Sequence, residues 1–405
     1  MRPNAFQKPL RTVWNVANHA TESLWWPAAA QKEQQRTKTV LLFVCGNPGL
    51  VEYYTDFLNA IYEQAANPYL EIVGVSHLGH SLGPHASGPQ PLYGLQEQID
   101  HKIACLDLLR SENPSDTQYI LMGHSMGSYV CAEVLKQRQQ HNIIRLIALF
   151  PTLREIALTP NGVTLSRSLF RVPLPIVSGV VGLASLIPGP IRQSLTGLIT
   201  GQKGNGLKVT AHGLMHASVV KNVVHMARQE MELIKELDDD FYATHVDKFI
   251  MYYSRNDQWA PLDHYEFMTE KFPNAQVHLC AEDIPHAFII VETSRRALAL
   301  LQARQHRPSS GEDAYRVDII GAETLPTKDQ LNQMASYLHG WQPLVSEQRQ
   351  PMPSTMQDAQ DILLKDPEAL KRPIVVDWSN GKAAVGDASL DTVEALIKHR
   401  LDLKE

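Results

Sequence analysis

The stretch that most constrains how this chain can fold is residues 123–127, which read Gly-His-Ser-Met-Gly. An apolar run at residues 119–122 precedes it, and residues 128–136 follow with the composition of a helix. Glycines two positions before and after Ser125 leave room for close backbone approach at a sharp, strained turn. The pattern therefore predicts a strand, a tight turn that presents a serine, and a helix.

Short apolar runs alternate with helical patterns along the first three quarters of the chain. The runs lie at residues 40–45, 70–76, 119–122, 143–150, 248–254 and 276–280. The helical patterns lie at residues 52–64, 95–109, 128–136, 262–271 and 293–304. Continuous apolar runs of this length are typical of buried parallel strands. Together with the serine turn, they predict an α/β-hydrolase fold, a doubly wound and mostly parallel sheet.

The rhythm of the elements divides the chain into segments. We expect an N-terminal extension at residues 1–38, without a secretion signal, in which Trp25 and Trp26 pack on the domain. The hydrolase domain spans residues 39–304, and the gap after residue 150 predicts a helical lid over about 152–247. Residues 305–314 read as a linker. Residues 315–405 form an α/β appendage, with strands near 315–320, 373–377 and 383–385 and helices near 328–338, 355–364 and 392–401.

The centre of the lid, residues 172–191, carries no charge and contains four prolines. A membrane-spanning helix needs roughly 20 apolar residues without such breakers, so we expect no span. Two interpretations stay open: the stretch is lid core over an acyl pocket, which the pattern alone favours, or it inserts shallowly into a lipid surface. The candidate lipid-contact residues are Val172, Ile176, Val177, Leu183, Leu186 and Ile187.

Charge and cysteine content exclude several classes of function. The net charge is −6 and no long basic run occurs, so the charge pattern does not indicate nucleic-acid binding. Four cysteines lie far apart without metal-ligand spacing, and we expect reduced, buried thiols, no metal and no organic cofactor. They are Cys45, Cys105, Cys131 and Cys280.

A nucleophilic serine needs a base and an acid that orients the base, and this fold supplies them in the order serine, acid, histidine. Asp257 directly follows the run at 248–254, and His286 follows the run at 276–280. One helix and one strand fit between them, as the fold requires. We therefore predict Ser125 as nucleophile, Asp257 as acid and His286 as base. The rival acids are Glu155, Glu282 and Asp283.

Donors for the oxyanion are expected from two backbone amides. One is the residue after the nucleophile, Met126, and the other comes from the Gly-Asn-Pro-Gly loop at residues 46–49. Pro48 has no N–H, which points to the amide of Asn47. Candidates for lining the site are His77, His80 and His124, with loop packing as the alternative for the first two and a structural role for the third.

The combined motifs resemble the lipid droplet-associated hydrolase family over residues 39–301. The likeness rests on residues 46–49, 76–80, 93–102, 123–129, 150–152, 159–162 and 284–288. The resemblance implies the triad Ser125, Asp257 and His286, hydrolysis of sterol esters, and association with lipid droplets and the endoplasmic reticulum. It also implies that the apolar lid segment contributes to droplet targeting, which moves the interpretation of residues 172–191 toward lipid contact.

Residues 325–331 and 372–382 resemble part of a fungal redox protein of thioredoxin fold. That fold's opening strand, cysteine and first helix have no counterpart, and no cysteine follows Arg304. We therefore expect no thiol redox chemistry here. The segment is interpreted as a fused remnant, an interaction module or the product of a mis-joined gene.

Three functional hypotheses follow. The first is a serine hydrolase of neutral lipid esters, sterol esters above all, that acts on the droplet surface and has an endoplasmic reticulum or cytosolic pool. The second is a droplet-organising protein with weak or vestigial activity, which the apolar lid segment motivates. The third is a soluble hydrolase of small esters or thioesters.

Overall fold

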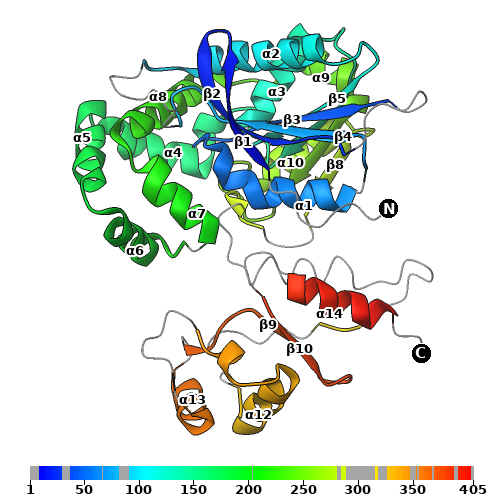
Figure 1. Ribbon diagram of the computed structural model, residues 1–405. Helices are drawn as coiled ribbons and strands as arrows, with labels where there is room; N and C mark the ends of the chain where they lie inside the picture. Colours follow the sequence, from blue (N-terminus) through cyan, green and yellow to red (C-terminus); the bar gives the residue numbers. More distant parts are fainter. Residues whose placement is uncertain are drawn as a thin grey trace. The chain divides into compact units, whose positions relative to one another are not determined.

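The structure is a computed structural model that describes residues 9–29, 37–65, 67–81, 91–202, 204–280, 284–288, 315–317, 326–346, 353, 355–366, 369–386 and 391–402. Contacts within the chain divide it into two units, Met1–Ile290 and Val291–Glu405, which are described separately. Figure 1 gives the order of the elements along the chain. The predicted helix at 293–304 and linker at 305–314 lie outside the described residues.

The first unit is built on an eight-stranded sheet with the order β1-β2-β4-β3-β5-β6-β7-β8. The strands from β3 onward pair in parallel, whereas β2 pairs antiparallel with both β1 and β4. The strands are β1 (Leu10–Val16), β2 (His19–Trp26), β3 (Thr39–Val44), β4 (Leu70–Val75), β5 (Gln118–His124), β6 (Ile143–Leu149), β7 (Phe249–Tyr253) and β8 (Gln276–Leu279). The predicted fold class, a mostly parallel α/β sheet, is confirmed.

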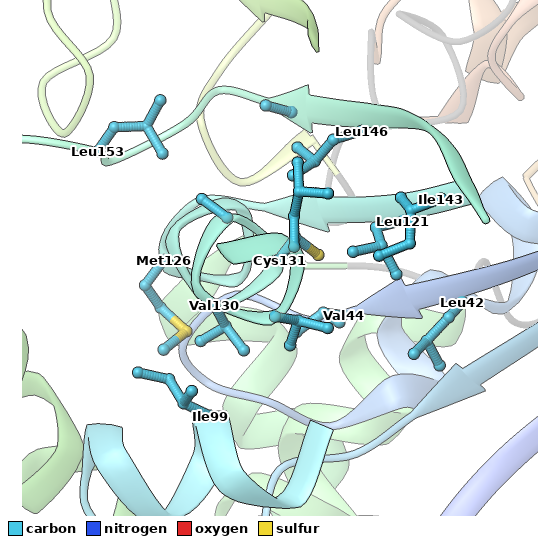
Figure 2. Packing of buried hydrophobic residues seen from close by; sticks show 14 of the residues in the cluster. Leu42, Val44, Ile99, Leu121, Met126, Val130, Cys131, Ile143, Leu146 and Leu153 are labelled. Atoms are coloured by element: carbon cyan, nitrogen blue, oxygen red, sulfur yellow. The ribbon is translucent and has the colours of Figure 1, made fainter. Parts of the chain in front are cut away.

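Central strand β3 is buried on both faces, and this explains its uninterrupted apolar sequence. Because successive side chains point to opposite faces, its residues enter two separate cores. Val40, Leu42 and Val44 join one core. Leu41, Phe43 and Cys45 join the other. Figure 2 shows the first core, where Met126, Val130 and Cys131 pack beside strand residues Val44 and Leu121.

Helices cover both faces of the sheet. Buried residues of α2, α3 and α10 belong to the first core, whereas α1 and the 3-10 helix before it contribute to the second. Figure 1 shows α1 separated from α2 and α3 by the strands. The bounds are Val51–Tyr54 for the 3-10 helix, Thr55–Ala65 for α1, Leu95–Glu112 for α2, Met126–Gln137 for α3 and Leu262–Lys271 for α10. Each lies where the sequence predicts a helix.

A helical insertion lies between β6 and β7, in the span predicted to be a lid. It contains α4 (Pro160–Arg167), α5 (Leu174–Ser185), α6 (Gly189–Thr200), α7 (Gly204–Val209), a π-helical turn (Thr210–Leu214), α8 (Ala217–Leu233) and α9 (Asp239–His245). Helix α5 packs against α8, and in Figure 1 the green helices α5 and α6 lie at the outer side of the insertion.

Helices α5 and α6 expose large apolar side chains. Leu183 is 71% exposed, Leu186 78%, Leu198 84% and Ile199 81%. Val172 and Ile176 are also exposed, and Val177 and Ile187 are half-buried. The interpretation as lid core is therefore wrong for most of this stretch, because α5 buries Ser178 rather than its leucines.

Within the described part of the chain, no single helix is long and apolar enough to cross a bilayer. By length and composition alone, the segment Pro160–Arg171 together with Leu174–Ser185 would suffice, with a bend of 84° between them.

The N-terminal segment differs from the sequence prediction, because residues 10–26 form a hairpin that extends the main sheet. The sequence gives no sign of this hairpin, because β1 is an edge strand that is exposed along most of its length and therefore needs few apolar residues. The predicted packing is confirmed for Trp26, which is fully buried and donates to Asn59 Oδ1 at 3.2 Å, whereas Trp25 is partly exposed.

The second unit has its own small core, formed around Leu331, Leu344 and Leu363. Its elements are α12 (Lys328–Tyr337), α13 (Met356–Leu363), β9 (Ile374–Asp377), β10 (Lys382–Val385) and α14 (Asp391–Asp402). Strands β9 and β10 form an antiparallel hairpin whose turn includes Gly381 at φ 62°. The predicted helices and this hairpin are confirmed. Of the strand predicted near residues 315–320, residues 315–317 are not in a strand, and residues 318–320 lie outside the described residues.

Candidate active site

Ser125 lies between β5 and α3 with φ 54° and ψ −127°, a conformation that is strained for a residue with a side chain. Glycine is required on both sides of it. A Cβ at Gly123 would lie 2.4 Å from the backbone of Gly127, and a Cβ at Gly127 would lie 2.3 Å from the carbonyl oxygen of Cys45. The predicted strand, turn and helix therefore occur as the motif requires.

His286 connects the serine to an acid. Its Nε2 lies 2.8 Å from Ser125 Oγ, and its Nδ1 lies 2.6 Å from Asp257 Oδ2. The other carboxylate oxygen of Asp257 accepts hydrogen bonds from the amides of Trp259 and Ala260, at 2.7 and 2.9 Å. Burial raises the pKa of Asp257, but the hydrogen bond from His286 and the two amides outweigh it, so the net pKa is lowered. Asp257 is therefore ionised and orients the imidazole.

Of the rival acids, Glu155 does not occupy this position. The carboxylate of Glu155 instead accepts a hydrogen bond from Arg154. Glu282 and Asp283 lie outside the described residues.

The loop at residues 46–49 approaches the elbow. A Cβ at Gly46 would lie 3.1 Å from the Cβ of Ser125. Among the described residues, no hydrogen bond outside the regular elements uses the N–H of Asn47 or of Met126. Met126 is the first residue of α3, where an amide has no partner within the helix. Both amides therefore remain candidate oxyanion donors.

The side chain of Asn47 ties this loop to the helical insertion. Its Nδ2 donates to the carbonyl oxygen of Val223 at 3.0 Å and to Glu230 Oε1 at 2.8 Å, both on α8. Burial raises the pKa of Glu230 to about 8, with a smaller opposing effect of Asn47. The sequence analysis missed Glu230. Its spacing of four residues from buried Met226 was the available signal, because that spacing places both on one helix face.

His77 and His80 are buried against the same loop. His77 Nε2 donates to the carbonyl oxygen of Cys45 at 3.0 Å, and the amide of Gly49 donates to His80 Nδ1 at 2.8 Å. Burial lowers the pKa of His80 to about 3, so the ring is neutral and accepts this bond. Both histidines thus brace the loop backbone, and their role in lining the site stays a prediction.

Aromatic rings surround the elbow residue His124. Its ring centroid lies 5.1 Å from that of Phe288 and 6.2 Å from that of Phe150. Its nitrogens lie within hydrogen-bond distance of Tyr54 and of the backbone of His286. The prediction named His124 but missed its contacts, because its partners are far apart in the chain.

Among the described residues, no group of three or more His, Cys, Asp or Glu side chains is arranged to hold a metal ion. None of the four cysteines forms a disulfide; three are buried and Cys280 is half-buried.

The sheet order, the elbow after β5 and the helical insertion after β6 define an α/β-hydrolase. A solved structure agrees on the fold. The 2-hydroxy-6-oxo-6-phenylhexa-2,4-dienoate hydrolase of Rhodococcus sp. strain RHA1 is 12% identical and superposes with a TM-score of 0.50, covering 73% of this chain and 98% of that chain.

The chain belongs to the lipid-droplet associated hydrolase family, whose sequence profile matches residues 37–289. The lipid droplet-associated hydrolase of Homo sapiens is 30% identical over 290 residues, covering 65% of this chain and 84% of that protein. The one of Gallus gallus is 27% identical over 299 residues, covering 71% and 90%. The resemblance seen in the sequence motifs is thus confirmed. Residues 286–386 match a second family, described as a protein of unknown function (DUF1687).

Proposed function

We propose that this chain hydrolyses ester bonds of neutral lipids, sterol esters in particular, at the surface of lipid droplets. The observation that carries the proposal is the hydrogen-bonded series Ser125, His286 and Asp257 in a chain that also exposes apolar helices. A serine with a base at 2.8 Å and an acid behind the base is the arrangement that acyl transfer needs.

In the proposed mechanism, His286 Nε2 takes the proton of Ser125 Oγ as Oγ attacks the ester carbonyl carbon. The negative charge on the carbonyl oxygen is stabilised by the amides of Asn47 and Met126. The alcohol leaves with the proton from His286, and the acyl group stays on Ser125. Water, deprotonated by His286, then attacks the acyl carbon, and the carboxylic acid leaves as Ser125 Oγ takes that proton back from His286. Asp257, ionised and buried, stabilises the imidazolium in both steps.

The lipid part of the proposal is supported by α5 and α6. Their outward leucines and isoleucines form a surface with no charged side chain between Val172 and Ile191. Contiguous exposed apolar surface of this kind marks interaction sites, and a helix lying in the interface buries such a face among acyl chains. The relatives are named for lipid droplets, which fits the same role.

A fluorophosphonate probe tests the nucleophile. We expect the probe to label the full-length protein. In Ser125→Ala the labelling rate should fall at least about a hundredfold, because only an activated serine reacts. Ser111→Ala is the matched control, since Ser111 is an exposed serine on α2. Equal labelling of the wild type and Ser125→Ala would refute Ser125 as nucleophile.

A substrate series tests the lipid surface. We expect faster hydrolysis of long-chain sterol esters on emulsion droplets than of short-chain esters in solution, because binding through the apolar helices would hold the protein at the surface where these esters are concentrated. Hydrolysis of soluble esters or thioesters alone, with no binding to droplets, would favour the soluble-hydrolase hypothesis instead.

The exposed helices also favour a second candidate function, the organisation of lipid droplets with only slow hydrolysis. Ser125→Ala separates the two in cells. Full rescue of droplet morphology by a stable, correctly targeted Ser125→Ala protein would support an organising role, and loss of rescue would count against it.

A further inference from the structure

The side chain of His124, which precedes Ser125 in the elbow, bonds to two other parts of the candidate site. Its Nδ1 lies 2.8 Å from Tyr54 Oη, and its Nε2 lies 2.8 Å from the backbone oxygen of His286. Tyr54 Oη lies 3.0 Å from the backbone nitrogen of Gly46. Three hydrogen bonds therefore connect the loop at residues 46–49, the serine elbow and the candidate base.

The chemistry of the end groups sets the direction of each bond. The amide of Gly46 can only donate, so Tyr54 Oη accepts from it and uses its own proton toward His124 Nδ1. The carbonyl of His286 can only accept, so His124 Nε2 carries a proton and donates to it. All donors and acceptors in the series are matched when His124 is neutral with its proton on Nε2.

The surroundings keep His124 in that state. Burial, and to a smaller extent the nearby His286, lower the pKa of His124 to about 3. Burial also raises the pKa of Tyr54 far above its usual range, so the hydroxyl keeps its proton. The ring centroids of His124 and His286 lie 5.1 Å apart, and a neutral His124 lets His286 become an imidazolium without a second positive charge beside it.

The segment that carries the base is also held by packing. Phe288 lies two residues after His286, and its ring centroid is 5.1 Å from that of His124 and 5.0 Å from that of Phe57. The His124 bond to the carbonyl of His286 and the Phe288 contact therefore anchor residues 284–288 at two points. Anchoring the backbone at these two points fixes the position from which the imidazole of His286 contacts Ser125.

We propose that Tyr54 and His124 are positioning residues, which hold the backbone of His286 in register with Ser125 and with the loop at residues 46–49. The inference rests on the proposed function, and it assigns to the histidine of the elbow a role in aligning the base. A misplacement of about 1 Å between catalytic groups can cost about a hundredfold in rate, so such an anchor is of direct use to catalysis.

Three variants separate the bonds of this series. Tyr54→Phe keeps the ring and removes the hydroxyl. His124→Asn places an amide near the Nδ1 position, too short to reach the carbonyl of His286. His124→Gln places an N–H near the Nε2 position and so retains a donor to that carbonyl. We expect Tyr54→Phe and His124→Asn to lower kcat and the fluorophosphonate labelling rate about tenfold, and His124→Gln to stay within about threefold of the wild type.

The measurement uses the full-length protein, a soluble short-chain ester and a thermal melt of each variant. We expect the loss in kcat, with KM unchanged, because the bonds align the base and do not bind substrate. Tyr62→Phe is the matched control, because it also removes a tyrosine hydroxyl, one that lies on α1 and donates to the carbonyl oxygen of Pro27.

Wild-type rates in Tyr54→Phe and His124→Asn would overturn the inference. So would equal losses in His124→Asn and His124→Gln that follow their melting temperatures, because these would indicate a purely structural role. Failure of the proposed function is a separate result, since it would appear as unchanged labelling of Ser125→Ala.

Discussion

Helices α5, α6 and α8 belong to the same insertion, yet α8 buries its apolar side chains whereas α5 and α6 expose theirs. Helix α8 buries Val219, Val224 and Met226 and directs polar groups to the loops of the site. Helices α5 and α6 expose Leu183, Leu186, Leu195, Leu198 and Ile199. The insertion therefore has an inner layer that is part of the folded core and an outer layer that leaves its apolar residues uncovered.

From this contrast we expect the two layers to serve different roles. The inner layer contributes hydrogen bonds that hold the loop of Asn47, so changes there should alter stability and the site. The outer layer contributes exposed apolar surface, so under the proposed function changes there should alter lipid binding and leave the fold intact. Each prediction below tests one side of that division.

The largest effect is expected from Glu230→Gln, and it depends on pH. Glu230 has a pKa of about 8 in the folded protein, raised from 4.5 by burial. The folded state therefore keeps a proton that the unfolded state releases above pH 4.5, and folding stability falls as pH rises from 4.5 to 8. The glutamine variant would lack this loss, so it should gain about 4 kcal/mol over the wild type by about pH 8 and less than about 1 kcal/mol at about pH 5.

Glutamine has nearly the same size and shape as glutamate, and its amide oxygen can accept the hydrogen bond from Asn47 Nδ2. Its amide nitrogen also offers a donor for Asn47 Oδ1, a buried oxygen without a hydrogen-bond partner among the described residues. Urea unfolding followed by tryptophan fluorescence, at several pH values between about 5 and about 8, measures the difference. Glu232→Gln, an exposed change on the same helix, is the control. Parallel curves for the wild type and Glu230→Gln would contradict the prediction.

A smaller effect is expected from Asn222→Leu, also on the inner layer. The fully buried Asn222 accepts a hydrogen bond from the amide of Tyr93 at 2.9 Å and donates to the carbonyl oxygen of Pro91 at 3.1 Å. Leucine has a similar branched shape but can make neither bond, so we expect a loss of about 2 kcal/mol in stability. Thermal unfolding checks the loss, and droplet binding of the folded protein should not change. Loss of droplet binding without loss of stability would contradict the assignment of lipid binding to the outer layer alone.

The inner elements were predictable from sequence, because burial leaves a pattern. The apolar strands, the glycines around Ser125 and the order of Asp257 and His286 all follow from local rules. The hydrogen bonds of Tyr54 and His124 were not predictable, since they join residues 70 and 162 positions apart. Contacts between residues so far apart leave no periodic pattern in the sequence, because they form only when the folded sheet brings the strand ends together.

The outer helices show another limit of sequence reasoning. Residues 172–191 are apolar on every side, so the sequence contains no polar face that would mark the exposed surface. The same run is compatible with a buried core and with a lipid contact. The pattern alone favoured the buried core, whereas the structure leaves most of the large apolar side chains exposed. The hairpin of β1 and β2 was missed for the opposite reason, since exposed edge strands need few apolar residues.

The smallest effect in free energy, and the most selective, is expected from Leu198→Ser on α6. Leu198 is 84% exposed, so its loss should change the stability of the fold by less than about 0.5 kcal/mol. If α6 lies in a lipid surface, the same change removes a buried leucine from that surface and should weaken binding to emulsion droplets about tenfold, or ~1.4 kcal/mol. Hydrolysis of a soluble short-chain ester should stay at the wild-type rate.

Leu233→Ser is the matched control for this test, because Leu233 is also exposed but ends α8 on the inner layer. Droplet flotation and a thermal melt measure both quantities on the same samples. Equal loss of binding in the two variants would mean that apolar exposure in general, rather than the face of α5 and α6, attracts the protein to lipid. Unchanged binding in Leu198→Ser would place the lipid contact elsewhere, and it would remove the reason to regard the outer layer as functional surface.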